Sequence, residues 1–370
     1  MERAKRSVLS EFAVPAAAVG VGLVLGAVLM LLTGASPLRG YGALLQGSFG
    51  SPVNVSETIV YITPLIFTGL SMAVAFRCGL FNIGAEGQFI VGMVAAAVAG
   101  CSIRGLPWIL HMPISVLAGA AAGALWASVP GFLKARFGVH EVVNTIMMNY
   151  IALYLSHYLV NGPIKDPAVT SPYSREVLAS ARLIRFMGEG GAFRVNMGTL
   201  IAIGAAFLVY YILWKTTVGY EIRAVGHNPD AARYAGISVA KNIITAMAIS
   251  GALAGLAGSV QVLGIQYRFL DLFAFEGYGF DGIAVSLVGK NHPFGILASA
   301  SLFGVLARGA QTMQGMARVP KETVGIIQAA VIFFVAAEGL IEGWLPGRRL
   351  LGSILPRKEG KSDGARSRNA

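Results

Sequence analysis

The stretch Lys215-TTVGYEIRAVGHNPDAARYAGISVA-Lys241 is the longest polar interruption of the chain that also has the pattern of a compact folded unit. It lies between two apolar segments, 197–214 and 242–263, that are each long enough to cross a bilayer. The whole chain has 370 residues, of which 55% are hydrophobic and 13% are charged. Because soluble domains carry about 25% charged residues, this composition excludes an ordinary soluble protein and predicts an all-α integral membrane protein.

A short helix is predicted inside this polar stretch. Asn228-Pro229-Asp230 is typical of a helix start, because Asn caps free N–H groups, Pro suits the first helical position and Asp complements the positive end of the helix dipole. Gly236 predicts the end of this helix, which would span 229–235. A rigid helix on the membrane surface suits contact with a soluble partner, and the alternative is an ordinary capped loop.

About ten segments are predicted to cross the membrane. They are 12–33, 55–76, 80–100, 107–130, 143–160, 197–214, 242–263, 277–289, 293–309 and 323–345. The third and the eighth are interrupted by Gly and by a carboxylate, and the eighth is short. The first is interpreted as a retained span, because its apolar run exceeds the usual signal-peptide core of about 7–15 residues.

Both tails are basic, which predicts cytoplasmic termini and agrees with an even number of spans. The chain then divides into an N-tail at 1–11, a transmembrane domain at 12–345 and a partly disordered C-tail at 346–370. The stretch 215–241 is cytoplasmic, and 161–196 is external although it carries five basic residues. The net charge of +11 is assigned to the cytoplasmic face, so no nucleic-acid partner is expected.

Three short patterns recur in the same order in the second half of the chain. Ile62-Thr63 and Thr68-Gly69 recur as Ile244-Thr245 and Ser250-Gly251. Gly84-Ala-Glu86-Gly87 recurs as Gly279-Phe-Asp281-Gly282. Glu141-x-Val143-x-x-Ile146 recurs as Glu322-x-Val324-x-x-Ile327. A separation of about five spans gives the two copies opposite orientations. Such an inverted repeat is typical of transporters, in which the solute path follows the repeat interface.

Several polar residues are candidates for that path. Glu86 and Asp281 occupy matching positions in the two interrupted segments, where a charge is expensive and functional by default. Their alternative role, which we favour, is to cap broken helices in the pathway wall. The other candidates for the path are Asn82, Gln88, Asn144 and Asn149, whose amides suit a polar uncharged solute or inter-helix hydrogen bonds.

Two glycine-rich stretches are predicted to pack helices closely. Gly119-Ala-Ala-Ala-Gly123 and Gly251-Ala-Leu-Ala-Gly255 both have small residues at a spacing that brings membrane helices together.

The sequence carries no pattern of an enzyme, a metal site or a cofactor site. The five His residues share no ligand spacing, and the chain has neither a phosphate-binding Gly-x-x-x-x-Gly-Lys-[Ser/Thr] loop nor a Gly-x-Ser-x-Gly nucleophile elbow. If ATP drives this protein, another chain must bind it.

Three motifs resemble those of ABC importer permeases. Gly219-Tyr-Glu-Ile-Arg-Ala-Val-Gly226, followed by Asn228-Pro229 and Ala235-Gly236-Ile237, resembles the coupling loop of the ribose, branched-chain amino acid and nucleoside permeases. Gly79-Leu-Phe-Asn-Ile-Gly-Ala-Glu-Gly-Gln88 looks like the signature of the nucleoside and simple-sugar branch, and Glu141-Val-Val-Asn-Thr-Ile-Met-Met-Asn-Tyr150 fits the same branch.

This resemblance implies a ribose-type fold in an inner membrane, working as a homo- or heterodimer with two ATPases and an extracytoplasmic binding protein. It implies a nucleoside as the solute first and a simple sugar second. The coupling roles fall on Glu221, Arg223, Gly226, Asn228, Pro229, Ala232 and Gly236, with Ala231, Ala232 and Ala235 allowing close approach of the ATPase. The alternative function is an ion-coupled secondary transporter, which the paired carboxylates would also fit.

Overall fold

The structure is a computed structural model that describes residues 2–186, 192–320 and 322–336. The described chain is built from helices, with only three isolated β-bridges between residues of its loops and turns. The helices are α1 (Glu2–Leu32), α2 (Pro37–Phe49), α3 (Pro52–Arg77), α4 (Ala85–Ser102), α5 (Trp108–Phe137), α6 (Glu141–Asn161), α7 (Met197–Lys215), α8 (Thr217–His227), α9 (Pro229–Tyr234), α10 (Val239–Gln261), α11 (Tyr278–Val288), α12 (Pro293–Ala317) and α13 (Glu322–Ala336). A 3-10 turn at Ala179–Ala181 and a π-helical turn at Val262–Gln266 complete the set.

The prediction of an all-α membrane protein is confirmed. Six described helices, namely α3, α4, α5, α7, α10 and α12, are long and apolar enough to cross a membrane. Shorter apolar helices occur at Ala17–Leu32, Tyr278–Val288 and Glu322–Val335. The end of the predicted span 323–345 and the predicted C-tail 346–370 lie outside the described residues.

Two helices were missing from the sequence prediction. Helix α2 lies in a segment taken as a connection, and α8 precedes the predicted helix within 215–241. Both are too short to give an apolar run of membrane length, which was the signal that the prediction used. Thr216 caps the start of α8, and its hydroxyl accepts a hydrogen bond from the Gly219 N–H at 3.2 Å.

The helix predicted at 229–235 is present as α9. The Asn228 side-chain oxygen accepts hydrogen bonds from the N–H groups of Asp230 and Ala231, each at 3.0 Å. Gly236 has a φ of +82°, in the left-handed region that favours glycine at a helix end. The local sequence therefore predicted both ends of this helix correctly.

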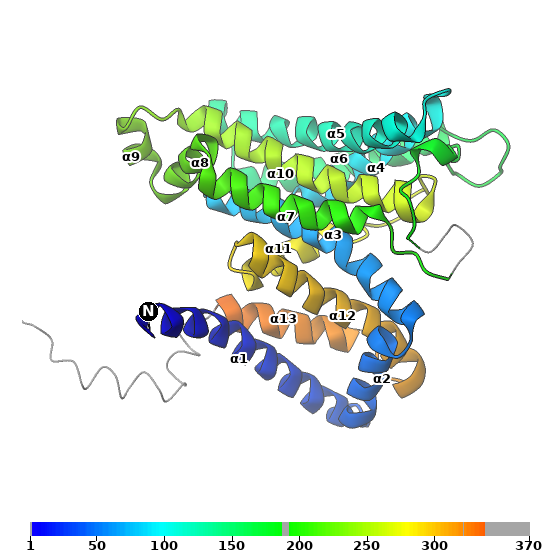
Figure 1. Ribbon diagram of the computed structural model, residues 1–370, viewed down its shortest axis with the longest axis vertical. Helices are drawn as coiled ribbons and strands as arrows, with labels where there is room; N and C mark the ends of the chain where they lie inside the picture. The colour runs from blue at the N-terminus through cyan, green and yellow to red at the C-terminus, as the bar shows by residue number, and fades with distance from the viewer. Residues whose placement is uncertain (1, 187–191, 321, 337–370) are drawn as a thin grey trace, which may run out of the picture.

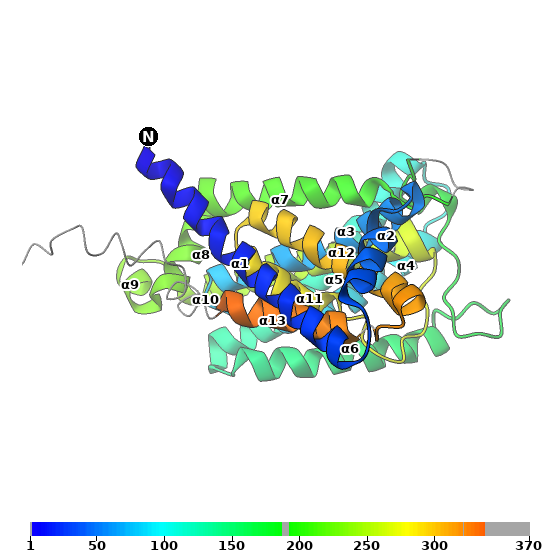
Figure 2. The same ribbon diagram turned by 90° about the horizontal axis from the view of Figure 1, so that it is seen from below.

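The helices form two groups that meet at α3 and α11 (Figure 1). One group contains α4, α5, α6, α7 and α10, and the other contains α1, α2, α12 and α13. Helices α8 and α9 project at one end of the molecule, and the start of α1 lies at that same end (Figures 1 and 2). The segment between α6 and α7 extends from the opposite end.

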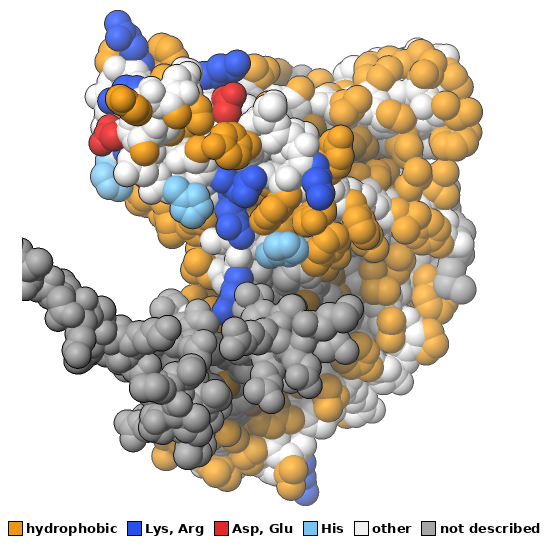
Figure 3. Space-filling model, turned by 60° about the vertical axis from the view of Figure 1, so that its left-hand side comes forward, with side chains coloured by type: hydrophobic (Ala, Val, Ile, Leu, Met, Phe, Trp, Pro, Cys, Tyr) orange, Lys and Arg blue, Asp and Glu red, His pale blue; other side chains and the backbone are white. Residues whose placement is uncertain are grey.

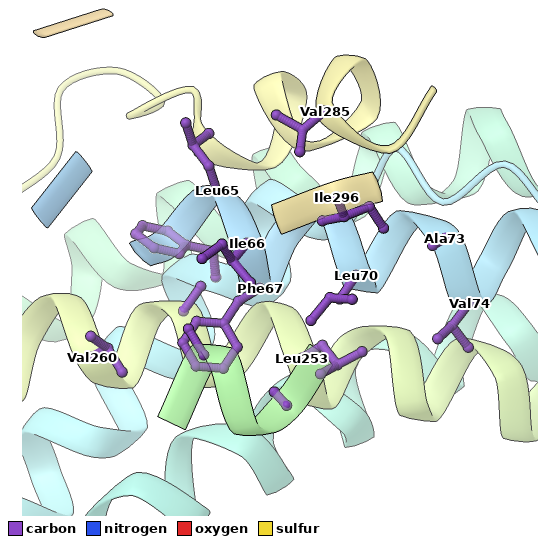
Figure 4. Close-up of a cluster of buried hydrophobic side chains, with 14 of the residues drawn as sticks. Leu65, Ile66, Phe67, Leu70, Ala73, Val74, Leu253, Val260, Val285 and Ile296 are labelled. Carbon is purple, nitrogen blue, oxygen red and sulfur yellow. The ribbon is translucent and has the colours of Figure 1, made fainter. Parts of the chain in front are cut away.

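Helix α3 is the centre of the packing. It contacts α10, α11, α12 and α7, so its side chains are buried around nearly the whole helix. Figure 4 shows Leu65, Phe67 and Leu70 of α3 between side chains of α10, α11 and α12. Phe67 and Leu70 are both 0% exposed, so this cluster joins the two groups of helices.

Helices α5 and α10 approach closely through the glycines predicted to pack them. A Cβ atom placed on Gly255 would overlap the Gly119 carbonyl oxygen and lie 3.2 Å from the Gly123 Cα atom. A Cβ atom on Gly251 would overlap the Gly123 carbonyl oxygen. The two glycine-rich stretches therefore pack against each other, backbone to backbone; the sequence predicted the close packing of each but not its partner.

Candidate functional site

Two interrupted segments meet in the interior of the molecule at the N-termini of α4 and α11. The chain leaves α3, runs through residues 78–84 without a regular helix and then begins α4. In the second half, residues 267–277 likewise precede α11. Gly279 lies directly against the Ala85–Glu86 backbone, where a Cβ atom would overlap the Glu86 nitrogen. The positive ends of two helix dipoles therefore point toward one place.

Glu86 ties these two segments together. Its side chain is 0% exposed, and its two carboxylate oxygens accept hydrogen bonds from the N–H groups of Gly277 at 2.8 Å and Gly279 at 2.6 Å. Glu86 thus caps α11 from the first turn of α4. Both of its oxygens are occupied by the backbone, which is the contact expected of a structural cap.

Asn82 and Gln88 form a closed amide pair. Each amide nitrogen donates to the oxygen of the other side chain at 3.0 Å. The Asn82 nitrogen also donates to the Ser250 hydroxyl at 2.8 Å, and its oxygen accepts from the Gly84 N–H at 3.1 Å. These bonds hold the interrupted segment against α10, where the Ser71 and Ser250 hydroxyls lie 2.9 Å apart.

Asn149 and Asn144 lie on α6 but differ in their contacts. The Asn149 oxygen accepts from the Gly87 N–H at 2.8 Å, and its nitrogen donates to the Ile83 carbonyl at 2.9 Å. Asn149 therefore fixes α6 to the interrupted segment. Asn144 is half-buried, and its side-chain nitrogen has no hydrogen-bond partner among the described residues.

Asp281 differs from Glu86 although the sequence repeat pairs them. It lies half-buried in the first turn of α11, and its carboxylate has no hydrogen-bond or ion-pair partner in the part of the chain that the structure describes. Glu86 and Tyr278 lie near it, within electrostatic range. Of the two carboxylates, only Asp281 keeps its oxygens available to another molecule.

Glu276 also belongs to this cluster, although no sequence pattern singled it out. Its carboxylate accepts hydrogen bonds from the Gln261 amide at 3.4 Å and the Gln266 amide at 3.3 Å. The amide oxygens of both glutamines are buried without a partner among the described residues. The sequence signal that could have identified Glu276 is its position one residue before Gly277, just outside the predicted span 277–289.

Aromatic rings border the same cluster. The Tyr278 ring lies 6.4 Å from the ring of Tyr61 and 5.7 Å from that of Phe89, measured between centroids. The Phe275 ring lies 5.2 Å from the ring of Tyr150 and 5.7 Å from that of Phe280. The region thus combines carboxylate and amide oxygens with aromatic faces.

The predicted coupling loop is anchored to the membrane domain at two points. Gly226 lies against the backbone of Arg77 and Cys78 with no room for a Cβ atom, and the Glu221 carboxylate accepts a hydrogen bond from the Asn242 amide at 2.9 Å. Helices α8 and α9 are therefore attached to the ends of both α3 and α10.

The remaining residues of the loop divide between inward and outward positions. The Arg223 guanidinium lies over the Trp214 ring, at 5.9 Å from its centroid. Ala232 is 4% exposed, so its side chain packs inside the chain, whereas Ala231, Tyr234 and Ala235 are exposed. These side chains are therefore accessible from outside, and Tyr234, at 97% exposed, was not singled out from the sequence.

Comparison with known proteins gives a family match over most of the chain. Residues 54–336 match the family described as the branched-chain amino acid transport system permease component. The chain is 44% identical to the guanosine ABC transporter permease protein NupP of Bacillus subtilis over 89% of this chain and 94% of that protein. It is 39% identical to the nucleoside ABC transporter permease protein NupB of Lactococcus lactis over 94% of this chain and 97% of that protein.

A third relative is named for a sugar. The glucose ABC transporter permease protein TsgB13 of Haloferax volcanii is 33% identical over 88% of this chain and 87% of that protein. No solved structure matches the chain. The matches and the apolar helices together identify a multi-pass protein of the plasma membrane. It is a permease subunit and not an enzyme, and ATP hydrolysis takes place on partner subunits. The chain belongs to the permease family of the branched-chain amino acid transport systems, in the branch that includes the nucleoside and simple-sugar ABC permeases.

Proposed function

We propose that this chain forms the membrane path of an ABC importer for a nucleoside, with a simple sugar as the second candidate solute. The observation that carries this proposal is the similarity along nearly the whole chain to permeases named for guanosine and for nucleosides, which exceeds that to the glucose permease. The partners would be two ATPase subunits, an extracytoplasmic binding protein and a second permease subunit, identical or homologous, within membrane lipid.

Ten membrane spans arranged as an inverted repeat form part of this proposal. The packing of the helices supports the repeat: α3 contacts α11 and α12, just as α10 contacts α4 and α5. The contact of α4 with α6 likewise corresponds to that of α11 with α13. The two interrupted segments that precede α4 and α11 occupy corresponding places in the two halves.

Both termini are proposed to be cytoplasmic. The start of α1 lies at the same end of the molecule as α8 and α9, which would contact the ATPase (Figure 1). The described residues of the loop 161–196 extend from the other end, where the binding protein would deliver the solute. The C-terminal residues beyond 336 are outside the described structure, so the support for this topology comes from the N-terminal end and from the basic composition of both tails.

The solute path is proposed to run past Asp281, Asn144 and Glu276. Nucleosides carry N–H and hydroxyl donors, which suit carboxylate and amide oxygens, and a flat base, which suits aromatic faces. Glu86, Asn82, Gln88 and Asn149 would form the wall of the path, because their polar atoms are already bonded to the chain.

Uptake by the complete transporter tests the solute. The permease, its ATPases and its binding protein would be reconstituted in vesicles, and uptake of labelled guanosine would be measured with ATP present. We expect uptake that requires ATP and that unlabelled guanosine or adenosine suppresses more strongly than glucose does. Stronger suppression by glucose would favour the sugar, and uptake driven by an ion gradient without ATP would support the secondary transporter instead.

A tryptophan on the exposed face of α9 tests the coupling role. Ala231→Trp is expected to lower ATP-driven uptake at least about tenfold, because a bulky side chain would disturb a closely packed contact with the ATPase. The variant should remain folded, since Ala231 is exposed. Leu208→Trp is the matched control, because Leu208 is 57% exposed on α7, away from the loop. Equal uptake by the two variants would contradict the assignment of α9.

A further inference from the structure

A small cavity lies where the coupling loop meets the membrane domain. Its volume is about 170 Å³, and its lining comes from the end of α3, from α8 and from the turn between α11 and α12. The residues that matter here are Arg77, Arg223, His227, Lys290 and Asn291. This volume is several times the roughly 30 Å³ of one water molecule. The cavity is therefore large enough for a small anion.

The lining is strongly basic. The guanidinium groups of Arg77 and Arg223 both lie over the Trp214 ring, at 5.1 and 5.9 Å from its centroid. Neither arginine forms an ion pair with a carboxylate of the described residues. Two like charges held on one indole repel each other, and a bound anion between them would remove that repulsion.

Hydrogen-bond donors in the cavity are held in place by the backbone. Lys290 and Asn291 have φ values of 53° and 51°, a conformation that non-glycine residues adopt at a cost. In this turn the Asn291 carbonyl accepts from the Arg77 Nε at 3.1 Å, and the Lys290 carbonyl accepts from an Arg77 terminal nitrogen at 3.4 Å. Arg77 is thus oriented before any ligand arrives.

Arg223 has greater freedom to contact a ligand. The only hydrogen bond of its side chain within the described residues runs from Nε to the Gly219 carbonyl of its own helix, at 3.4 Å. Its two terminal nitrogens therefore remain available, and a guanidinium of this kind binds phosphate oxygens in pairs.

Figure 3 shows that this end of the molecule is hollowed and that Lys and Arg side chains gather along the hollow. We propose that the cavity binds a phosphate group, either the headgroup of an anionic lipid or free inorganic phosphate. The bound group would link α8 to α3 and to the turn before α12, and so add to the hydrogen bonds that Arg77 already donates to that turn. This binding site is independent of the identity of the transported solute.

Binding of two defined probes to the purified full-length chain in neutral detergent tests the proposal. One arm measures the thermal stability of the chain with inorganic phosphate against chloride at equal ionic strength. The other arm measures, by native mass spectrometry, binding of phosphatidylglycerol against phosphatidylcholine. We expect one of the two phosphate-bearing probes to bind, and Arg223→Gln to weaken that binding at least about tenfold.

A second arginine outside the cavity provides the control. Arg233→Gln removes an equal charge from the exposed surface of α9, outside the cavity, and should leave binding unchanged. Phosphate binding assigns the site to the free anion, and binding of phosphatidylglycerol alone assigns it to a lipid headgroup. The proposal is overturned if neither probe binds better than its reference, or if Arg233→Gln weakens binding as much as Arg223→Gln does. Arg223→Gln should keep the thermal stability of the parent without a probe, so that loss of binding is not loss of fold.

Discussion

Replacing Gly255 with leucine is expected to destabilise the folded chain by more than about 3 kcal/mol. Gly255 faces the Gly119 carbonyl and the Gly123 backbone, so the nearest atoms belong to main chain and cannot rotate away. A leucine side chain would force α5 and α10 apart along their whole shared face. The apparent melting temperature of the chain purified in detergent measures this effect.

Gly204→Leu is the matched control for this substitution. Gly204 is exposed on α7, and a Cβ atom placed there meets no other atom within 4 Å. The control adds the same side chain in the same apolar environment, so it should melt close to the parent. If Gly255→Leu also melted close to the parent, the backbone contact between α5 and α10 would not be a determinant of stability.

Glu86→Ala is expected to impair folding, whereas Asp281→Ala is expected to leave folding intact and impair transport. Glu86→Ala leaves the N–H groups of Gly277 and Gly279 buried without their acceptor. It should destabilise the chain by about 2–6 kcal/mol, since each buried donor left unsatisfied costs about 1–3 kcal/mol. Asp281→Ala removes a half-buried carboxylate that has no partner among the described residues, so the stability should remain or rise. Its ATP-driven uptake should fall at least about tenfold.

Conservative variants separate these roles further. Glu86→Gln keeps one acceptor oxygen for two donors and should have an intermediate melting temperature. Asp281→Asn should fold as the parent does but transport poorly, because it exchanges an acceptor oxygen for a donor. Normal uptake by Asp281→Asn, together with a parent-like melting temperature for Glu86→Ala, would show that the two carboxylates have been assigned the wrong way round.

Local patterns of the sequence predicted what depends on neighbouring residues. The cap at Asn228, the stop at Gly236 and the six long apolar helices all follow from short-range chemistry. The close packing of Gly119–Gly123 on Gly251–Gly255 could also be predicted as a contact type, although its partner could not be named. Long spans and strong caps therefore identified most of the fold.

Features that depend on contacts between distant segments could not be predicted from local patterns. The acceptor role of Glu86 depends on Gly277 and Gly279, which lie in the other half of the chain. The repeat predicted the same role for Glu86 and Asp281. Only their surroundings in the fold show that the Glu86 oxygens accept backbone hydrogen bonds, whereas those of Asp281 have no partner among the described residues. Ala232 was expected to face the ATPase, and its burial became visible only when α9 was placed against the rest of the chain.

The double attachment of the α8–α9 unit has a mechanical consequence. Gly226 rests on the last residue of α3, and Glu221 is bonded to the first turn of α10, so a force applied to α9 reaches both central helices at once. These two helices touch again at Ser71 and Ser250, deeper in the molecule. The three contacts tie α8, α3 and α10 together, so a displacement of α9 would move both central helices rather than one of them.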